Sequence, residues 1–326
     1  MIPQTSVIIT CYNVDDYLPE ALESVCAQTR PVREIIIVDD GSDRPVQRPA
    51  NWQGAPLQIF RTSNRGAAAA RNLGVSLADG NFIAFLDADD AWAPTKIEMQ
   101  EELLASDTSS AAVFTRRVER AGWNPCPPIE YPSSDISDDE FWIRMWTENF
   151  ITLSAMMIRR DVFLRVGGFD ERLPPCEDWE LWFRVLTQGR ILQVPSALCY
   201  RRIHPQQLTK KFDRIMVYHR KCRLIVMRDH GKRLASAGLP IGQQRKQAEK
   251  EYREHLLILY FQRHFVTARR LLWKYLITHP FDISILKYAL VSLLPGQLLA
   301  NWRDDVPAAV NAEMSNKRIS EGIRRP

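Results

Sequence analysis

The sequence predicts a doubly wound α/β fold with a mostly parallel sheet, followed by a helical C-terminal region. Runs of apolar residues alternate with helical patterns at spacings of tens of residues, which is typical of parallel strands joined by crossover helices. The run at residues 82–86 is apolar throughout, as expected of a strand that is covered on both faces. Each long run ends in polar residues, so we expect the strand ends to line one edge of the sheet, where ligands bind in open α/β folds.

The first hundred residues predict strands and helices in regular order. The expected strands are residues 6–10, 34–38, 57–60 and 82–86, and the expected helices begin near residue 18 and cover residues 66–78. Asp15 and Asp16 are candidate caps for the first of these helices. Asp90 is a candidate cap for a further helix that would begin at the following Ala-Trp-Ala-Pro.

The rest of the chain is less regular. Its expected elements are a surface loop at residues 121–140, a strand at 152–158, a turn at 167–171, an edge strand leading into a basic loop at 196–204, amphipathic helices within 243–276, an apolar helical segment at 281–299 and a frayed tail at 306–326. Trp179, Trp182, Phe183 and Leu186 recur at helical spacing, so one face of their helix is expected to pack on the core.

The composition is that of an ordinary soluble globular protein. The 326 residues are 45% apolar and 25% charged, which suits one large domain with an appendage or two domains. Six cysteines without a CxxC pair are expected to be reduced thiols of a cytosolic protein. The N-terminus lacks the pattern of a signal peptide, and the longest nearly apolar run, residues 288–300, is too short to span a membrane.

Charge is distributed unevenly along the chain. Residues 201–326 hold 25 Lys and Arg against 10 Asp and Glu, a net charge of +15, and the remainder carries −11. This asymmetry indicates an anionic partner, either nucleic acid or an anionic membrane surface. A basic amphipathic region suits membrane docking, but apolar helical stripes more often pack as a cap against the rest of the protein, which we favour.

Three carboxylates, Asp87, Asp89 and Asp90, follow the strand at residues 82–86. Acids so close together repel each other unless a cation neutralises them, and Mg²⁺ often takes one or two carboxylates together with substrate phosphates. The alternative is a loop with an acidic helix cap. No histidine precedes His204, which argues against a zinc site or a His-based triad in the sheet.

The usual phosphate-binding loops are absent from the sequence. Neither GxGxxG after the first strand nor GxxxxGK[ST] occurs, so a bound nucleotide would be held by acids, by Arg71 and by a metal. Tyr12 could stack on a base and Asp40 could accept a hydrogen bond from it. A rim aromatic and a turn acid in Asp-Gly-Ser remain the alternatives for these two residues.

An ordered set of short motifs resembles family 2 of the inverting glycosyltransferases, which use nucleotide-diphospho-sugars and have a GT-A fold. The matching stretches are residues 6–13 (SVIITCYN), 34–42 (EIIIVDDGS), 64–66 (NRG), 70–72 (ARN), 78–80 (ADG), 85–90 (FLDADD), 167–171 (GGFDE) and 177–182 (EDWELW). Tyr200-Arg201-Arg202-Ile203-His204 resembles the family's YR-x-H segment, although two arginines stand where one is usual. Beyond about residue 206 the resemblance ends.

The resemblance implies a donor site. Asp87-Ala88-Asp89 would be the DxD element, in which Asp87 and Asp89 hold Mn²⁺ or Mg²⁺ against the donor diphosphate. The residues that the resemblance assigns to substrate binding are Thr10, Tyr12, Asn13, Asp40, Arg71, Asp87, Trp179, Arg202 and His204. Within this set Asp40 would contact the base, and Arg202 and His204 the diphosphate; for the last two, a plain basic strand end is the alternative.

The Glu177-Asp178 dyad resembles the family's general base. Inverting displacement at an anomeric carbon requires a carboxylate opposite the leaving group, where it takes the proton of the acceptor hydroxyl. We assign Asp178 as the base and Glu177 as its supporting neighbour. The alternative is that both acids only cap a helix, whose N-terminus favours negative charge.

The sequence therefore predicts a metal-dependent inverting glycosyltransferase. We expect a GT-A domain over residues 1–205, with a nucleotide-sugar half to about 110 and an acceptor half over 111–205, and a basic helical region at 206–326. The donor would be UDP-, GDP- or dTDP-linked, and the acceptor a saccharide or lipid-linked saccharide in surface polysaccharide or glycoconjugate synthesis. The expected location is cytoplasmic, with the inner face of the membrane as an open alternative.

Three other classes of protein fit the sequence less well. A nucleotidyltransferase would carry a Gly-rich, Lys-containing N-terminal loop, which the sequence lacks. A non-catalytic GT-A-like scaffold or sugar-nucleotide-binding protein would not need both acidic motifs. A nucleic-acid binder could use the basic region, but that region has no recognised reading motif, so no nucleic-acid partner is expected.

Overall fold

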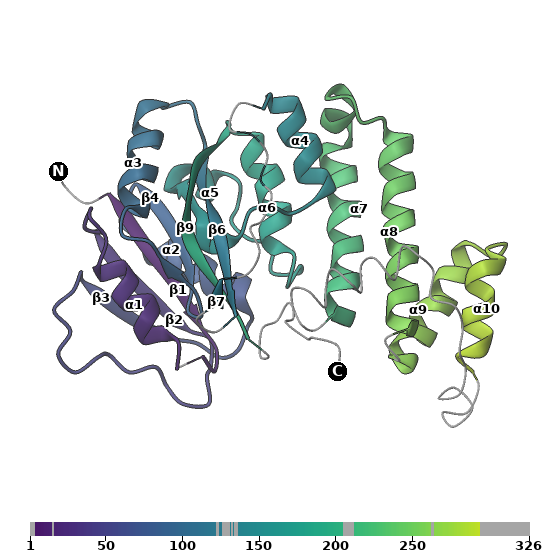
Figure 1. Cartoon of the computed structure of the whole chain (residues 1–326), viewed down its shortest axis with the longest axis horizontal. Helices are drawn as coiled ribbons and strands as arrows, with labels where there is room; N and C mark the ends of the chain where they lie inside the picture. Colours follow the sequence, from purple (N-terminus) through teal and green to yellow (C-terminus); the bar gives the residue numbers. More distant parts are fainter. Residues whose placement is uncertain are drawn as a thin grey trace. The chain divides into compact units, whose positions relative to one another are not determined.

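The computed structural model describes residues 4–14, 16–121, 124–125, 131, 133, 136–204, 212–261 and 264–293. The chain divides into two compact units. The first comprises Met1–His204 with Lys232–Gly238, and the second comprises Pro205–Gly231 with Leu239–Pro326. Figure 1 shows the α/β elements of the first unit and the helices of the second.

The first unit is built on a mixed sheet. Its strands are β1 (Thr5–Cys11), β2 (Glu34–Asp39), β3 (Leu57–Arg61), β4 (Phe82–Asp87), β5 (Ala91–Trp92), β6 (Ala112–Ala121), β7 (Asn124–Pro125), β8 (Met156–Arg159) and β9 (Ile191–Ile203). They form the order β3-β2-β1-β4-β8-β6-β9-β5, with β7 on β6. The neighbouring strands β3, β2, β1 and β4 are parallel to one another. β8 is antiparallel to both its neighbours, β4 and β6, and β6 and β9 run parallel to each other. The carboxyl ends of β1, β2, β4, β6 and β9 therefore lie at one edge.

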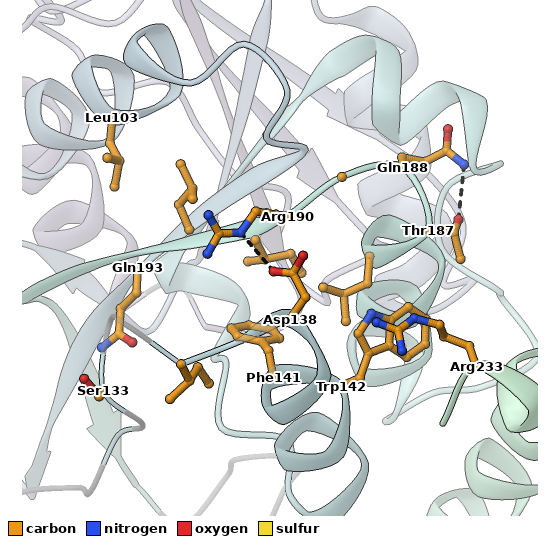
Figure 2. A pocket seen from close by; sticks show the side chains of 15 residues that line it. Leu103, Ser133, Asp138, Phe141, Trp142, Thr187, Gln188, Arg190, Gln193 and Arg233 are labelled. Carbon is orange, nitrogen blue, oxygen red and sulfur yellow. Dashed lines mark hydrogen bonds and ion pairs between the residues drawn. The ribbon is translucent and has the colours of Figure 1, made fainter. Parts of the chain in front are cut away.

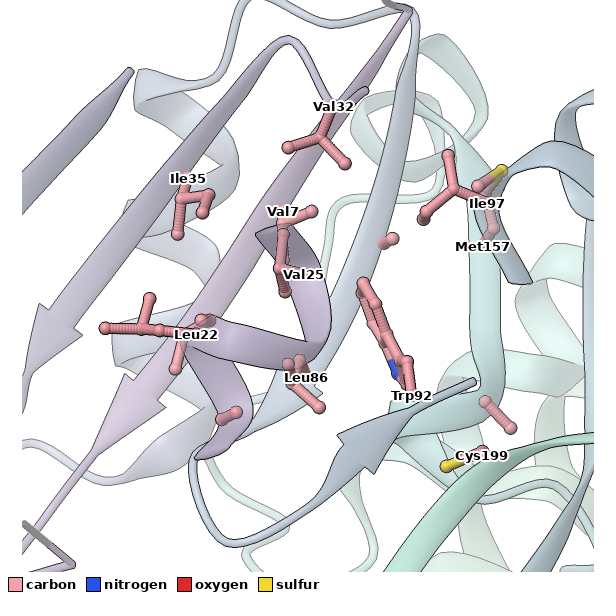
Figure 3. Close-up of a cluster of buried hydrophobic side chains, with 14 of the residues drawn as sticks. Val7, Leu22, Val25, Val32, Ile35, Leu86, Trp92, Ile97, Met157 and Cys199 are labelled. Carbon is pink, nitrogen blue, oxygen red and sulfur yellow. The ribbon is translucent and has the colours of Figure 1, made fainter. Parts of the chain in front are cut away.

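Helices cover both faces of this sheet. The helices of the unit's α/β part are α1 (Leu18–Cys26), α2 (Ala67–Leu77), α3 (Lys96–Ser106), α4 (Asp138–Thr147), α5 (Arg160–Arg165) and α6 (Glu177–Leu186), with a short 3₁₀ turn, η1 (Leu153–Ala155). Alternate strand residues such as Val7 and Leu86 form one core with Leu22, Val25 and Trp92, from α1 and β5 (Figure 3).

The opposite face of the sheet packs against α2 and α5. Ile8 and Phe85, which are paired across β1 and β4, point to this side. A Cβ on Gly74 of α2 would lie 2.5 Å from Ile8 Cγ2, so only glycine allows this close approach of helix and strand. Phe163 of α5 packs against Phe85, with ring centroids 5.8 Å apart. The predicted doubly wound fold is confirmed.

Several element predictions need correction. Tyr17, not Asp16, is the N-cap of α1, and it makes no side-chain cap hydrogen bond; Asp15 lies outside the described residues. Asp90 caps no helix, because Ala91–Trp92 forms β5 and α3 begins only at Lys96. The strand ending at residue 203 is not an edge strand, since β6 and β5 pair with its two sides.

The segment predicted as a strand at residues 152–158 is a 3₁₀ turn followed by β8. The turn occurs where Ser154 bonds the acidic loop: its hydroxyl donates to Asp90 Oδ2 at 2.6 Å and accepts from Asp87 N at 3.1 Å. Parts of the predicted surface loop at 121–140 lie outside the described residues, and its end forms the first turn of α4.

The second unit is helical. It contains the greater part of α7 (Phe212–Ser236), together with α8 (Ile241–Phe261), α9 (Phe265–Thr278) and α10 (Ile283–Val291). Leu256, Leu259, Leu272 and Ile285 belong to its apolar core. The one or two amphipathic helices expected within 243–276 are the two helices α8 and α9, whereas no separate helix was predicted at α7. Residues 294–299 and the predicted tail at 306–326 lie outside the described residues.

None of the helices in the described part of the chain is long and apolar enough to span a bilayer.

Candidate active site

The strand register brings the predicted site residues to one edge of the sheet. Thr10, at the end of β1, pairs with Asp87 of β4 on one side and with Val38 of β2 on the other. Asp39 pairs with Cys11, so Asp40 and Tyr12 follow directly on neighbouring strands. This arrangement was expected from parallel strands that all end in polar residues.

Asp87, Asp89 and Asp90 form a compact oxygen cluster. Each offers a carboxylate oxygen, and the three oxygens lie within 4.8 Å of one another. Burial, followed by the charge of Asp87, raises the pKa of Asp89 above its usual value, although His204 opposes this shift. Burial and the charges of Asp89 and Asp87 raise the pKa of Asp90 well above its usual range. A bound cation would relieve this repulsion.

The hydrogen bonds indicate which of the three acids has a carboxylate oxygen available for a metal ion. Asp90 has both oxygens occupied, since Ser154 Oγ donates to one and the Arg202 backbone N–H to the other at 3.1 Å. Asp87 accepts a hydrogen bond from Arg71 on Oδ1 only, and Asp89 contacts His204 Nε2, at 2.8 Å, through Oδ2 only. Asp87 and Asp89 therefore each keep a second carboxylate oxygen for a ligand. The donor set fits a hard divalent ion held mainly by Asp87 and Asp89.

Arg71 connects this cluster to the start of α6. Its buried guanidinium donates to Asp87 Oδ1 at 2.8 Å and to Glu177 Oε1 at 2.6 Å. Burial lowers the pKa of Arg71, but the two carboxylates outweigh burial and the pKa lies above its usual value. Arg71 is thus a permanent cation between the acidic loop and the Glu177-Asp178 dyad.

Asp178 is partly buried in the first turn of α6. Its Oδ1 accepts from Trp179 N at 2.6 Å, and its Oδ2 accepts from Asn149 Nδ2 at 3.3 Å. Burial and the neighbouring charge of Glu177 raise the pKa of Asp178 to about 7, against the opposing charge of Arg71. The bond to Trp179 N satisfies one free N–H of the helix start, so a capping contribution is present beside the perturbed pKa.

Among the buried polar atoms that lack hydrogen-bond partners within the described ranges, three belong to residues of this site: Asn149 Oδ1, Glu177 Oε2 and His204 Nδ1. Buried polar atoms are normally paired, so such atoms beside charged side chains are positions where a bound ligand could donate or accept. Asn149 was not among the predicted residues. No sequence signal identifies it, because it is one asparagine in the connection between α4 and η1.

Several predicted substrate-binding side chains already have protein partners. Asp40 accepts from the backbone N–H groups of Arg65 and Gly66, at 2.8 and 2.7 Å, and thereby holds the loop before α2. Asn13, with a positive φ of 53°, exchanges hydrogen bonds with Asp43. Trp179 is buried, and its indole donates to Met145 O at 2.7 Å, which places this side chain in the core and not on the site surface.

The remaining predicted residues lie around the acidic loop. Tyr12 is 49% exposed, as an aromatic that stacks on a ligand must be. Arg202 bonds Glu20 and donates to Asp89 O at 3.2 Å, and its guanidinium lies over the Tyr17 ring. The ring of His204 also contacts Tyr17, with centroids 4.8 Å apart. The end of β9 therefore borders the oxygen cluster.

A cavity of about 700 Å³ lies elsewhere in the first unit. Figure 2 shows Arg190, Phe141, Trp142 and Arg233 at its wall, with Arg190 paired to Asp138. Its lining includes Ile191, the first residue of the 13-residue β9, whereas the oxygen cluster borders the other end of that strand. At about 3.3 Å per residue the two ends are roughly 40 Å apart. This cavity is therefore separate from the candidate site.

Two family models match the chain. "Glycosyl transferase family 2" matches residues 6–167, and "Glycosyltransferase like family 2" matches residues 130–231. The first match contains the oxygen cluster and Arg71, and the second contains the Glu177-Asp178 dyad.

The curated relatives are named only as uncharacterized glycosyltransferases. The chain is 31% identical to YwdF of Bacillus subtilis over 195 residues, covering 59% of this chain and 71% of YwdF. It is 29% identical to a Rickettsia felis protein over 220 residues, covering 65% of this chain and 36% of that protein. The chain thus spans about a third of the length of the Rickettsia felis protein and of its counterparts in Rickettsia conorii and Rickettsia bellii.

Among solved structures, the chain resembles Staphylococcus aureus TarS. The crystal structure of TarS 1-349 in complex with UDP-GlcNAc superposes with a TM-score of 0.57 at 18% identity, covering 97% of this chain and 85% of that one. At this identity the likeness shows the fold.

Proposed function

Because the chain belongs to glycosyltransferase family 2, we propose that it is a metal-dependent inverting enzyme that transfers a sugar from a nucleoside-diphosphate sugar to an acceptor hydroxyl. One observation carries the proposal: Arg71 ties Asp87 of the oxygen cluster to Glu177, the immediate neighbour of a carboxyl whose pKa is about 7. Leaving-group stabilisation and proton removal require two such acidic groups, held at a fixed separation.

Asp87 and Asp89 would hold the metal and the donor diphosphate. A bound Mn²⁺ or Mg²⁺ supplies positive charge that neutralises the diphosphate as it leaves. Arg202 and His204, which border the cluster at the end of β9, would face the same phosphates. Arg71 would act on the donor through Asp87, because its guanidinium donates a hydrogen bond to Asp87 Oδ1 and leaves the other oxygen to hold the metal. It is a positioning residue in this proposal.

Asp178 would act as the general base. A base works best when its pKa lies near the working pH, because it is then ionised and still basic enough to accept a proton. Burial and Glu177 supply that shift here. Asn149 donates to one carboxylate oxygen and orients the group toward the acceptor. Its unpaired Oδ1 would accept a hydrogen bond from an acceptor hydroxyl.

The nucleoside would lie over the ends of β1 and β2. Thr10 and the exposed ring of Tyr12 would form the wall of the base pocket, with Asn13 and Asp40 beneath them. Because Asp40 and Asn13 bond the surrounding loops, their contribution would be to shape the pocket as much as to contact the base. The acceptor would be a saccharide or lipid-linked saccharide of surface polysaccharide or glycoconjugate synthesis, met in the cytoplasm.

A donor panel tests this function. We expect one family of nucleotides, linked to UDP, GDP or dTDP, to raise the melting temperature in the presence of Mn²⁺ and to do so much less with EDTA. At 100 times its Kd, a ligand stabilises the folded state by about 2.7 kcal/mol, which corresponds to several degrees. Differential scanning fluorimetry checks this. Equal shifts with and without the metal would contradict the metal-dependent site.

The transfer rate should depend on pH through Asp178. Only the ionised carboxylate accepts a proton, so with a pKa of about 7 the rate should fall roughly tenfold per pH unit below that value and level off above it. The charged groups that act on Asp178 are Glu177 on its own helix and Arg71 from α2. The measurement is kcat against pH at saturating donor. A flat profile between about pH 5.5 and 8 would exclude this base.

A further inference from the structure

The helices α9 and α10 of the second unit expose apolar side chains beside basic ones. The members of this set, which we name the α9–α10 face, are the apolar Val266, Trp273, Ile277, Phe281, Ile283 and Leu290 and the basic Arg269, Arg270, Lys274 and Lys287. Phe281, in the turn between the helices, is 92% exposed, and Ile277 is 81% exposed. Large exposed apolar side chains that gather in one region mark interaction sites, whereas single ones need no explanation.

This exposure follows from the helical spacing. On α9 the exposed residues recur at intervals of three and four from Val266 to Ile277, which makes one continuous stripe. The opposite stripe, which includes Ala268, Leu272 and Leu276, is buried in the core of the unit. The unit already has its core, so the outer apolar side chains are not required for its packing.

The α9 part of the face carries positive charge that the described acids do not compensate. Residues 264–293 contain one acid, Asp282. Its carboxylate is used internally: it accepts from Ile285 N, Ser284 Oγ and Tyr275 Oη, and pairs with Arg253 at 3.3 Å. In the part of the chain that the structure describes, Arg269, Arg270 and Lys274 make no ion pair. By contrast, Arg223 of α7 pairs with Glu251 of α8, and Arg253 of α8 pairs with Asp282.

We propose that the α9–α10 face docks this protein on an anionic membrane surface. Aliphatic and aromatic side chains enter the boundary between headgroups and acyl chains, while Lys and Arg at the same level meet lipid phosphates. Neither helix spans a bilayer, so the contact is peripheral. A second copy of the chain is a poorer partner, because a two-fold contact through this face would set its basic side chains against the same set.

The docking is tested by co-sedimentation of the full chain with vesicles. Vesicles of phosphatidylcholine with about one third phosphatidylglycerol should bind the protein, and pure phosphatidylcholine vesicles should bind it far less. Raising the salt from about 0.05 to 0.5 M should release it, because screening weakens attraction to the surface charge. Comparable binding to both vesicle types, at any salt concentration, would overturn the proposal.

Two charge-removing variants test whether vesicle binding depends on the α9–α10 face or only on the net charge of the protein. Arg269→Gln/Arg270→Gln should weaken partitioning to anionic vesicles by roughly 10- to 30-fold. The matched control, Arg245→Gln/Lys246→Gln, removes the same charge from exposed positions of α8 and should change partitioning little. Equal losses in the two double variants would mean non-specific attraction and would reject the face.

The apolar part is tested by Ile277→Ser/Phe281→Ser. Both side chains lie outside the core, so the melting temperature should hold while vesicle binding drops at least severalfold. The alternative outcome is that the wild type does not bind vesicles but self-associates, as measured by light scattering, and that this variant abolishes the self-association. In that case the face is an interface between copies and the membrane proposal fails.

Discussion

Replacing Asp178 with asparagine is expected to abolish sugar transfer while leaving donor binding intact. Asparagine cannot take the acceptor's proton, and loss of a general base typically lowers the rate by about two to four orders of magnitude. The donor diphosphate would be held on the far side of Arg71, at Asp87 and Asp89, so its affinity should change little. The amide oxygen can still accept from Trp179 N, so α6 should begin at the same residue.

The difference in stability between Asp178→Asn and wild type should depend on pH. The folded-state pKa of Asp178 is raised, so the folded state binds its proton more tightly than the unfolded chain does. Wild type therefore loses stability as pH rises toward and through about 7, whereas Asp178→Asn has no such loss. The variant should melt at or above the wild-type temperature at pH 8, and the difference should shrink toward pH 5. Thermal melts at both pH values check this.

Glu177→Gln is the matched control for Asp178→Asn. Glu177 pairs with buried Arg71, so its neutralisation leaves that cation with Asp87 alone and should lower the melting temperature. If Glu177→Gln stops transfer while Asp178→Asn is nearly unaffected, the base lies one residue upstream. A folded Asp178→Asn protein that transfers at the wild-type rate would contradict the assignment outright.

Asp89→Asn is expected to remove the metal dependence of donor binding. If Asp89 holds the metal, the variant loses one charged ligand, and a cation at a developing charge is worth several kcal/mol, or about a hundredfold or more in affinity and rate. Asparagine can keep the contact with His204, so the fold should persist. Calorimetric titration of the nucleotide with and without Mn²⁺ measures the loss. Unchanged Mn²⁺-dependent affinity would reject Asp89 as a ligand.

Asp90→Asn is the control within the same loop. Asp90 is buried, with both oxygens bonded to Ser154 and Arg202, so its replacement should affect stability more than metal binding. The two variants should thus have different defects. Asp89→Asn should abolish the metal dependence of donor binding, and Asp90→Asn should lower the melting temperature. The reverse pattern would exchange the roles of the two acids.

The parallel half of the fold and its acidic edge were predictable from sequence because both depend on local patterns. An apolar run such as residues 82–86 specifies a buried strand, and polar residues at successive strand ends must meet at one edge. The predicted strands β1, β2, β3 and β4 extend only one residue or so beyond their expected bounds. The dyad likewise starts α6 as its pattern predicted.

Contacts between distant segments could not be predicted. Arg71 and Glu177 are 106 positions apart, and only the folded chain shows that one guanidinium serves both acids. Asn149 gives no local signal at all. β9 was taken for an edge strand because its partner β5 has only two residues, too few for an apolar pattern. α7 was missed because charged residues are interspersed among the apolar ones along most of its length, so no clear apolar stripe marks it in the sequence.

The proposed function requires that this chain catalyse transfer and not merely hold a nucleotide-sugar. The most direct measurement is nucleoside diphosphate release from the stabilising donor with Mn²⁺, for wild type and Asp178→Asn at saturating donor. We expect release by wild type, its loss with EDTA, and a rate at least about a hundredfold lower in Asp178→Asn despite unchanged donor affinity. Donor binding by both proteins, with no release by wild type above the buffer rate, would contradict it.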